Sequence, residues 1–339
     1  MNRYLLQKQE SGELAPVCVE AADPEIGSGE LLVRMKACSL NYRDLLMKSG
    51  KSASGGDGEV VPLSDGAGEV VAVGEGVIDY EVGDRVALTF FQDWEDGRFN
   101  MRYHKAARGG SCDGVLSELV GVPAHSVVKF PEYMTYAEAA ALPCAAVTAW
   151  QGLMEREGRL SESETVLCLG TGGVSVFALQ IAKAAGAKVI ITSSSNDKLA
   201  RAKELGADEG IHYRETPDWD REVHRITEKR GVDHVIEVGG PGTLEKSMNS
   251  VAAGGCISMI GVLTGFDAPE TSLFPLVARA VNLNGIYVGS RAMFERMNAF
   301  LTEHQIRPVI DRSFSFSEAP AAYKYLESGS HFGKIVIEF

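Results

Sequence analysis

The residues best suited to chemistry stand in a glycine-rich segment near the middle of the chain. Residues 166–175 read Val-Leu-Cys-Leu-Gly-Thr-Gly-Gly-Val-Ser, after an apolar β-rich run and before a helical one. A turn of this kind binds a dinucleotide, because its glycines allow a tight bend and close approach of the pyrophosphate to a helix N-terminus. The alternative is an ordinary strand–helix turn. We expect cofactor contacts from Gly170, Thr171, Gly172, Gly173 and Val174, with Ser175 in place of a third glycine.

The choice of cofactor depends on the end of the next strand. Proteins that bind NAD place an acid there, about 20 residues after the glycines, to hold the ribose 2′-hydroxyl. This chain has Ser193, Ser194 and Ser195 at that point, followed by Lys198, and Tyr213 follows the third strand. Hydroxyls and a lysine can bind a 2′-phosphate, so we expect NADP(H). Serine-rich loops are also common helix caps, and the neighbouring Asp197 counts against a phosphate.

Alternating strands and helices position this turn. The alternation from Tyr136 onward is typical of a parallel sheet with crossover helices. The expected strands are 165–169, 188–192, 234–238, 256–260 and 282–289, and the expected helices are 174–185, 198–205 and 291–304.

The residues before about 130 have a different pattern. Short β-rich runs at 30–38, 68–73, 84–91 and 116–122 are separated by turn signals and interrupted by one helix, 41–49. We expect loops at 54–58 and 92–112 and a further β-like segment at 333–339. Because this last segment resembles the N-terminal part, the β-rich domain is expected to be discontinuous, with the α/β domain inserted into it.

Composition excludes several classes of protein. At roughly 150 residues per domain, 339 residues predict two domains. A net charge of −13 without any Lys/Arg block argues against nucleic-acid binding and against a polybasic membrane anchor. We find no apolar run long enough to span a bilayer and no apolar signal core, so we expect a cytoplasmic protein. The six cysteines lack C-x-x-C spacing, which favours reduced thiols.

Several motifs in chain order resemble the medium-chain dehydrogenase/reductase superfamily, specifically its zinc-free quinone oxidoreductases. They span essentially the whole chain, at residues 41–44, 62–70, 82–86, 140–150, 166–175, 237–240, 260–262 and 333–336. The resemblance implies an α/β fold: a doubly wound Rossmann domain (131–296) and a discontinuous GroES-like β-rich catalytic domain (1–130 and 297–339). It also implies an active site in the cleft between the two domains and a homodimer formed through the edge strand at 282–289.

The resemblance also raises the question of zinc, because many relatives carry the label of zinc-type alcohol dehydrogenase. In zinc-dependent members the catalytic metal is held by a Cys, a His and a second Cys, and the matching positions here are Asn41, Ser64 and Cys144. An amide, a hydroxyl and one thiol are not a zinc donor set. The loop that would carry a structural zinc has only Cys112. We therefore expect no metal.

Without zinc the substrate should already be electrophilic, as quinones, enones and other activated alkenes or carbonyls are. Asn41 and Tyr42 are candidates to stabilise the oxygen that becomes negative. Tyr42 could donate the proton, or it could form a wall of the cleft while water supplies the proton. We interpret Asp44 as an anchor of the helix more than as a base. The positions of the zinc enzymes' proton relay hold Arg43 and Leu46.

The remaining expectations come from family positions. Thr148, Gly239, Gly261 and Lys334 match positions near the cofactor. The aromatic run 90–94 could line a substrate pocket or anchor the following loop.

The leading interpretation is an NADPH-dependent, zinc-independent oxidoreductase that transfers hydride to quinones or other activated alkenes and carbonyls. One alternative is an alcohol or aldehyde dehydrogenase of the same superfamily. Another is a non-catalytic, crystallin-like protein that binds NADPH.

Overall fold

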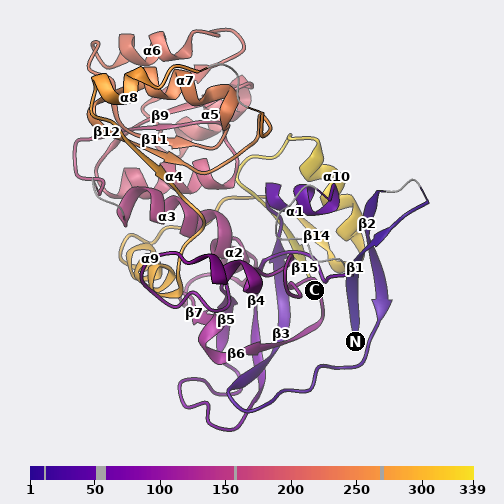
Figure 1. The fold of residues 1–339 in the computed structure, drawn as a ribbon. Helices are drawn as coiled ribbons and strands as arrows, with labels where there is room; N and C mark the ends of the chain where they lie inside the picture. The colour runs from indigo at the N-terminus through magenta and orange to yellow at the C-terminus, as the bar shows by residue number, and fades with distance from the viewer. Residues whose placement is uncertain (11–12, 51–58, 156–158, 268–270) are drawn as a thin grey trace. The chain divides into compact units, whose positions relative to one another are not determined.

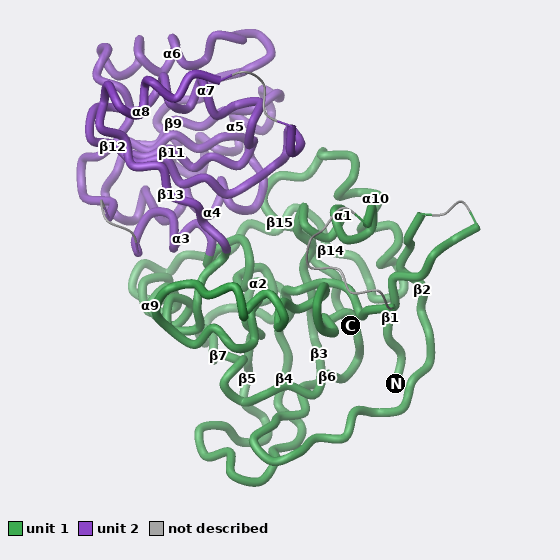
Figure 2. Tube along the Cα trace, viewed as in Figure 1, with its two compact units in different colours: residues 1–147, 288–339 green, residues 148–287 purple. Residues whose placement is uncertain are grey.

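The computed structural model describes residues 1–10, 13–50, 59–155, 159–267 and 271–339 (Figure 1). The chain forms two compact units (Figure 2). Unit 1 comprises residues 1–147 and 288–339, and unit 2 comprises residues 148–287. The expected loop at 54–58 lies outside the described residues.

Unit 2 is built on a six-stranded sheet in which all strands run parallel. The strand order is β10-β9-β8-β11-β12-β13. Numbered within the unit this is 3-2-1-4-5-6, the order of a dinucleotide-binding Rossmann sheet. The strands are β8 (Thr165–Cys168), β9 (Lys188–Ser193), β10 (Glu209–His212), β11 (Val232–Glu237), β12 (Val251–Met259) and β13 (Asn282–Gly285).

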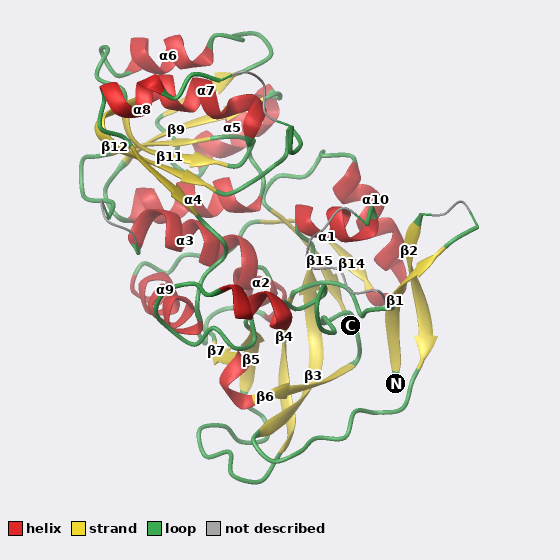
Figure 3. Ribbon diagram, in the orientation of Figure 1, coloured by secondary structure: helices red, strands yellow, loops and turns green. Residues whose placement is uncertain are grey.

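Helices connect these strands and pack against the sheet (Figure 3). They are α3 (Val147–Met154), α4 (Gly173–Ala184), α5 (Asn196–Glu204), α6 (Trp219–Ile226), α7 (Pro241–Ser250) and α8 (Phe274–Ala278). The central strands β8 and β9 are buried over nearly their whole length, because helices cover the faces of a parallel sheet. Leu167, Ile190, Val235 and Ile257 from four neighbouring strands are buried in one core cluster.

Unit 1 contains a seven-stranded sheet and a separate hairpin. The sheet order is β14-β15-β3-β4-β5-β7, with β6 also paired to β3, and β1 pairs with β2 in the hairpin. The strands are β1 (Asn2–Lys8), β2 (Leu14–Glu20), β3 (Glu30–Ser39), β4 (Asp65–Val73), β5 (Arg85–Leu88), β6 (Leu119–Pro123), β7 (Val127–Lys129), β14 (Ile310–Ser315) and β15 (Lys334–Glu338).

Short helices complete unit 1. They are α1 (Tyr42–Lys48), η1 (Met101–Ala106), η2 (Ala124–Ser126), α2 (Tyr136–Ala140), the π-helical turn η3 (Leu142–Ala146), α9 (Arg291–Glu303), η4 (Phe316–Glu318) and α10 (Ala319–Glu327). Apolar side chains of β3, β4, β5 and β15 meet α10 in a single core cluster.

The C-terminal strand joins the N-terminal part of the chain directly. Val336, Ile337 and Glu338 of β15 pair antiparallel with Ser39, Cys38 and Ala37 of β3. The predicted fold class, a Rossmann sheet with a discontinuous β-rich domain, is confirmed. The units divide after residue 147 and before residue 288; the domain boundaries expected after 130 and before 297 stay predictions.

The segment 92–112, expected to be an irregular loop, contains the 3-10 helix η1 and two isolated β-bridges. Its aromatic residues are anchors. Phe91 and Trp94 are each 1% exposed, and Trp94 stacks on Tyr103 with ring centroids 5.8 Å apart. The aromatic run therefore packs the loop onto the unit. Among the described residues we find no helix of the length and apolarity needed to cross a bilayer.

Candidate active site

Helix α1 of unit 1 carries the predicted catalytic residues. It begins where β3 ends: Asn41 has an extended backbone, with φ −131° and ψ 157°, and caps the helix. The Asp44 carboxylate accepts a hydrogen bond from the Asn41 backbone N–H at 2.7 Å. This satisfies one of the donors that a helix N-terminus leaves open, so Asp44 anchors the helix. Tyr42 is 39% exposed.

A buried carboxylate, Asp65, organises the polar residues around α1. Asp65 is the first residue of β4 and is fully buried. Its Oδ1 accepts from the Ser64 hydroxyl at 2.7 Å, and its Oδ2 accepts from the Cys144 backbone N–H at 3.2 Å. The Lys334 ammonium lies 3.5 Å from Oδ2. Asp65 therefore connects β4, η3 and β15 through one side chain.

Lys334 fixes the orientation of the Asn41 amide. The buried Nζ of Lys334 donates to Asn41 Oδ1 at 2.6 Å and to the Leu40 carbonyl at 2.8 Å. An ammonium group can only donate, so the amide oxygen must face Lys334. The amide nitrogen then faces the other way, where Asn41 Nδ2 is buried and has no hydrogen-bond partner among the described residues.

The three positions that would hold a zinc ion come together around this cluster, but their chemistry does not fit the metal. Asn41 points its oxygen at an ammonium, and the Ser64 hydroxyl donates to Asp65. Cys144 offers the only thiol among the three positions, and a zinc site takes three or four strong N, S or O ligands. In the described part of the chain no three His, Cys, Asp or Glu residues gather at a metal-binding distance.

Burial also shifts the pKa of Asp44. Loss of solvation raises the pKa of its carboxyl group to about 6, against the lowering effects of the Arg43 charge and the Asn41 N–H. Asp44 Oδ1 has no hydrogen-bond partner among the described residues. The OH of the buried Tyr323 also has none, and burial, with the Asp44 charge as the second cause, raises its pKa.

The predicted cofactor turn lies in unit 2, between β8 and α4. Gly170 has a φ of +71°, a backbone conformation that other residues rarely adopt. Its N–H donates to Thr192 Oγ1 at 3.0 Å, and Ser175 Oγ donates to the Leu169 carbonyl at 2.6 Å, so both sides of the turn are tied to the sheet. A Cβ atom on Gly172 would meet nothing within 4 Å. The turn thus leaves room beside the helix N-terminus where a pyrophosphate can approach.

The three serines stand at the end of β9, on the strand next to the turn. Ser193 is buried and ends the strand, and its Oγ accepts from the Ser195 N–H at 3.3 Å. Ser195 caps α5 by accepting from the Lys198 N–H at 3.4 Å. The Tyr213 N–H donates to the Ser193 carbonyl at 3.0 Å. The structure therefore brings Ser193, Ser195, Lys198 and Tyr213 together and also shows the capping role.

Gly239 follows β11 and Gly261 follows β12, and both are hydrogen-bonded to one buried acid, Glu237. The Glu237 carboxylate accepts from the N–H groups of Gly239 and Gly240 and from the Thr243 hydroxyl, at 2.8, 3.0 and 2.6 Å. The Gly261 N–H donates to the Glu237 carbonyl at 3.2 Å. Thr148, the remaining cofactor candidate of this unit, is buried on α3.

Sequence reasoning missed Asp65 and Glu237, the two buried acids that hold these loops. Asp65 begins β4 and Glu237 ends β11, but β4 also contains Glu69 and β11 also contains Asp233, so the sequence carried no clear signal for either acid. The sequence predicted Lys334 as a cofactor contact, but it did not predict the hydrogen bond from Lys334 to Asn41.

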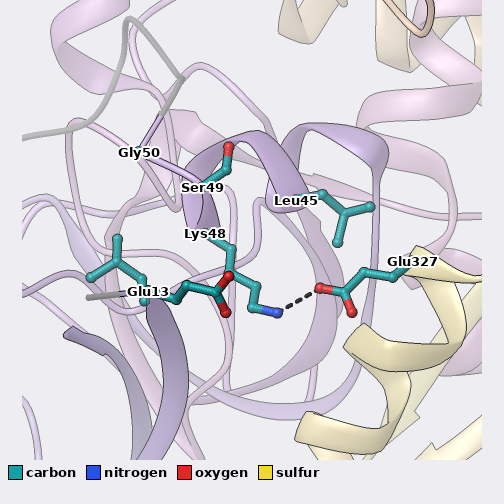
Figure 4. A pocket seen from close by; sticks show the side chains of 7 residues that line it. Glu13, Leu45, Lys48, Ser49, Gly50 and Glu327 are labelled. Carbon is teal, nitrogen blue, oxygen red and sulfur yellow. Dashed lines mark hydrogen bonds and ion pairs between the residues drawn. The ribbon is translucent and has the colours of Figure 1, made fainter. Parts of the chain in front are cut away.

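A separate pocket of about 450 Å³ lies at the C-terminal end of α1. Its lining includes Leu45, Lys48 and Glu327, and the last two point toward one another and form an ion pair at 2.5 Å (Figure 4). None of the predicted site residues lines it.

Comparison with known proteins defines the class to which this fold and site belong. The family model for the alcohol dehydrogenase GroES-like domain matches residues 27–132, and the model for zinc-binding dehydrogenase matches residues 173–303. The chain is an oxidoreductase of the medium-chain dehydrogenase/reductase superfamily, whose members use nicotinamide cofactors and act on small molecules.

Particular relatives cover the chain from end to end. A zinc-type alcohol dehydrogenase-like protein of Schizosaccharomyces pombe is 43% identical over 99% of both chains. The 2-methylene-furan-3-one reductase of Solanum lycopersicum is 33% identical over 93% of this chain and 73% of its own length.

Solved structures agree. A crystal structure assigned to the alcohol dehydrogenases, from Sinorhizobium meliloti 1021, is 41% identical with a TM-score of 0.92, over 100% of this chain and 98% of its own. A quinone oxidoreductase of Pseudomonas syringae is 26% identical with a TM-score of 0.81, over 100% of this chain and 99% of its own.

Proposed function

We propose that the protein is an NADPH-dependent, zinc-independent oxidoreductase that transfers hydride to quinones or other activated alkenes and carbonyls. The observation that carries the proposal is the Lys334–Asn41–Asp65 cluster, in which an ammonium group and a carboxylate bind the residues that stand at the zinc-ligand positions. A site without a metal cannot polarise an unactivated ketone in the way zinc does. Relatives named as an enone-type reductase and a quinone oxidoreductase support this substrate class.

The residues of unit 2 fit NADPH. Gly170, Thr171, Gly172, Gly173 and Val174 would hold the pyrophosphate, because the turn is open at Gly172 and continues into α4. Ser193, Ser194, Ser195, Lys198 and Tyr213 would hold the 2′-phosphate. Thr148, Gly239 and Gly261 complete the proposed set. When bound, the cofactor supplies the hydride.

The residues of unit 1 would act on the acceptor. The buried Asn41 Nδ2 donates to no group in the described part of the chain, so it can hydrogen-bond an oxygen that gains negative charge. The exposed Tyr42 is available to donate a proton or to line the site. Asp44 holds the N-terminus of α1 and so keeps Asn41 in place.

The direct test is a turnover screen with p-benzoquinone, an enone, an aldehyde and a secondary alcohol, each with NADPH or NADH in reduction and NADP⁺ or NAD⁺ in oxidation. We expect reduction of the quinone and the enone with NADPH, unchanged by a chelator. Stoichiometric zinc in the purified protein, or alcohol oxidation as the fastest reaction, would contradict the proposal. NADPH binding without turnover of any acceptor would favour a crystallin-like role.

A Ser193→Asp variant tests the cofactor preference. A carboxylate at the end of β9 would repel a 2′-phosphate and accept from a free 2′-hydroxyl. Losing one or two charge-assisted hydrogen bonds corresponds to roughly a 10- to 100-fold weaker NADPH affinity. Fluorescence titration with both cofactors measures the change. Ser161→Asp is the matched control, because it places the same charge on an exposed residue of unit 2 outside the proposed site. Equal NADPH affinity in wild type and Ser193→Asp would refute the 2′-phosphate site.

We also propose a homodimer formed through unit 2. β13 is the edge strand of its sheet, and no side chain of the helix α8 that precedes it is fully buried. Phe274 and Val277 of that helix are 71% and 78% exposed. An edge strand beside an apolar surface fits a second copy of the chain. Analytical ultracentrifugation tests this proposal. Wild type should sediment as a dimer and a Phe274→Glu/Val277→Glu variant as a monomer, and a monomeric wild type would contradict it.

A further inference from the structure

Arg43 is held rigidly on unit 1, one residue before Asp44. Its Nη1 donates to the Arg108 carbonyl at 2.8 Å, and its guanidinium carbon lies 4.6 Å from the centroid of the Phe90 ring. Both supports are buried. Arg108 is itself fixed, because its Nε donates to the Thr89 carbonyl and its Nη2 to Ser126 Oγ, at 3.0 and 2.7 Å.

The opposite edge of the Arg43 guanidinium is unused. Nε and Nη2 are both buried and have no hydrogen-bond partner among the described residues. The residue as a whole is half-buried, so this edge lies beneath the surface and not in the core. Buried donors without partners are rare in folded proteins, and each one calls for an explanation.

Another arginine of this chain shows what kind of group the Nε/Nη2 edge of a guanidinium can bind. Arg225 uses its Nε and Nη2 to bind the carboxylate of Glu222, with N–O distances of 2.7–3.0 Å. The two N–H groups point in parallel and match an oxygen that carries negative charge. Asp44, beside Arg43, does not fill this role, because its Oδ2 accepts from the Asn41 N–H and no described residue hydrogen-bonds to its Oδ1.

We propose that the Nε/Nη2 edge of Arg43 binds the carbonyl oxygen of the acceptor and stabilises its negative charge as hydride arrives. This inference rests on the proposed reductase function. Arg43 would polarise the carbonyl group, which zinc does in the zinc-dependent enzymes. The acceptor gains a hydride at carbon, its displaced π-electron pair moves to that oxygen, and water then supplies the proton. NADPH is oxidised to NADP⁺ in the same step.

The charges beside Arg43 favour a neutral carbonyl over a permanent carboxylate. Arg43 already lies next to the buried Asp44, and Lys334 faces the buried Asp65. A substrate that brought its own carboxylate would add a further charge to these buried acids, which is costly. An oxygen that becomes charged only during hydride transfer gains its stabilisation in the transition state.

The test compares Arg43→Met and Arg43→Lys with wild type on p-benzoquinone and 2-cyclohexenone. The enone is the weaker electrophile, so its reduction depends more on stabilisation of the negative charge that forms on its carbonyl oxygen. We expect Arg43→Met to lower kcat for the enone by roughly 100- to 1,000-fold, the effect of removing an oxyanion donor, and to lower it much less for the quinone. Arg43→Lys keeps the charge without the paired N–H groups and should recover part of the loss.

Two further measurements separate this role from others. NADPH affinity and the thermal midpoint should stay close to wild type in Arg43→Lys. Arg102→Met is the matched control, because Arg102 also lies over an aromatic ring, that of Tyr103, but is exposed. If Arg43→Met does not fold, the enone-selective loss in Arg43→Lys carries the test.

Failure of the inference differs from failure of the proposed function. A wild-type protein that reduces neither acceptor with NADPH refutes the proposed function. An active wild type with folded Arg43 variants that reduce the enone within threefold of its rate overturns the role of Arg43. Equal losses on enone and quinone, or a parallel loss of NADPH affinity, would also overturn it.

Discussion

Lys334 Nζ lies 2.6 Å from Asn41 Oδ1 and donates a hydrogen bond to it across 293 positions of sequence. The contact decides which end of the Asn41 amide can meet a ligand, because only the amide nitrogen remains open. It also joins the last strand of unit 1 to its first helix.

Replacing Asn41 by Asp should separate these two roles. The carboxylate can still accept from Lys334, but it removes the outward N–H donor at Nδ2. We expect a fall in enone kcat of roughly 100-fold, as for loss of an oxyanion donor. We also expect some loss of stability, because the second carboxylate oxygen replaces a buried amide nitrogen. Steady-state kinetics and a urea titration measure both quantities. Unchanged turnover in the folded variant would remove Asn41 from the reaction.

Replacing Lys334 by Met should destabilise unit 1. Asp65 is fully buried and would lose the cation that faces it. Removing one member of a buried ion pair costs about 3–5 kcal/mol. Urea unfolding followed by tryptophan fluorescence measures this loss. The double variant Lys334→Met/Asp65→Asn should recover part of it, because no buried charge is then left unpaired.

The same pair of variants tests the family-based prediction that Lys334 contacts the cofactor. Its ammonium is already occupied by Leu40, Asn41 and Asp65. We expect the double variant to bind NADPH within about threefold of wild type, a difference well below 1.4 kcal/mol. A tenfold loss of affinity would instead support the cofactor contact.

Gly172→Ala should weaken cofactor binding without weakening the fold. The added Cβ meets no protein atom within 4 Å, and the backbone at Gly172 has φ −78°, which alanine adopts easily. The methyl group would occupy the space through which the pyrophosphate approaches. We expect a thermal midpoint within about 2 °C, a change of under 1 kcal/mol, and at least a tenfold higher NADPH Kd. A normal Kd would place the pyrophosphate elsewhere.

Asp44 should make stability depend on pH between about 4 and 6. Burial raises its pKa to about 6 in the folded protein, above the value of ~3.9 in an unfolded chain. In this window the folded state binds more protons than the unfolded state, so this group's effect is to lower stability as pH rises.

Asp44→Asn removes that titration while keeping an oxygen that can accept from the Asn41 N–H. We subtract the free energy of unfolding of wild type from that of the variant at each pH. This difference should be larger at pH 7.5 than at pH 4.5, by up to about 3 kcal/mol, since two pKa units correspond to that amount. Urea titrations at both pH values measure the difference. If the free energies of unfolding of the two proteins differ by the same amount at both pH values, the pKa of Asp44 is not raised.

The Rossmann unit could be predicted from the sequence because its signals are local. Gly170, Gly172 and the following apolar helix lie within one short segment, and the alternation of strands and helices continues on both sides. The N-terminal hairpin β1–β2 and the helix α7 had weaker periodicity and were not predicted. Tertiary pairing, such as Tyr4 opposite Cys18, decides such elements.

The polar cluster could be predicted only in part, because its members are distant in sequence. Asn41, Ser64 and Cys144 were matched one by one through family motifs. The hydrogen bonds through Asp65 and Lys334 that connect them depend on β15 pairing with β3. Periodicity carries no information on which strand of a discontinuous sheet lies beside which.

The interrupted course of unit 1 also sets an order of events during synthesis. Residues 148–287 emerge from the ribosome before β15 exists, and domains generally begin to fold as they emerge. Asp65 therefore stays without its cation until Lys334 has been made. Unit 2 can be complete while unit 1 is still open, so a nascent chain would form the glycine-rich turn first and the Lys334–Asp65 ion pair last.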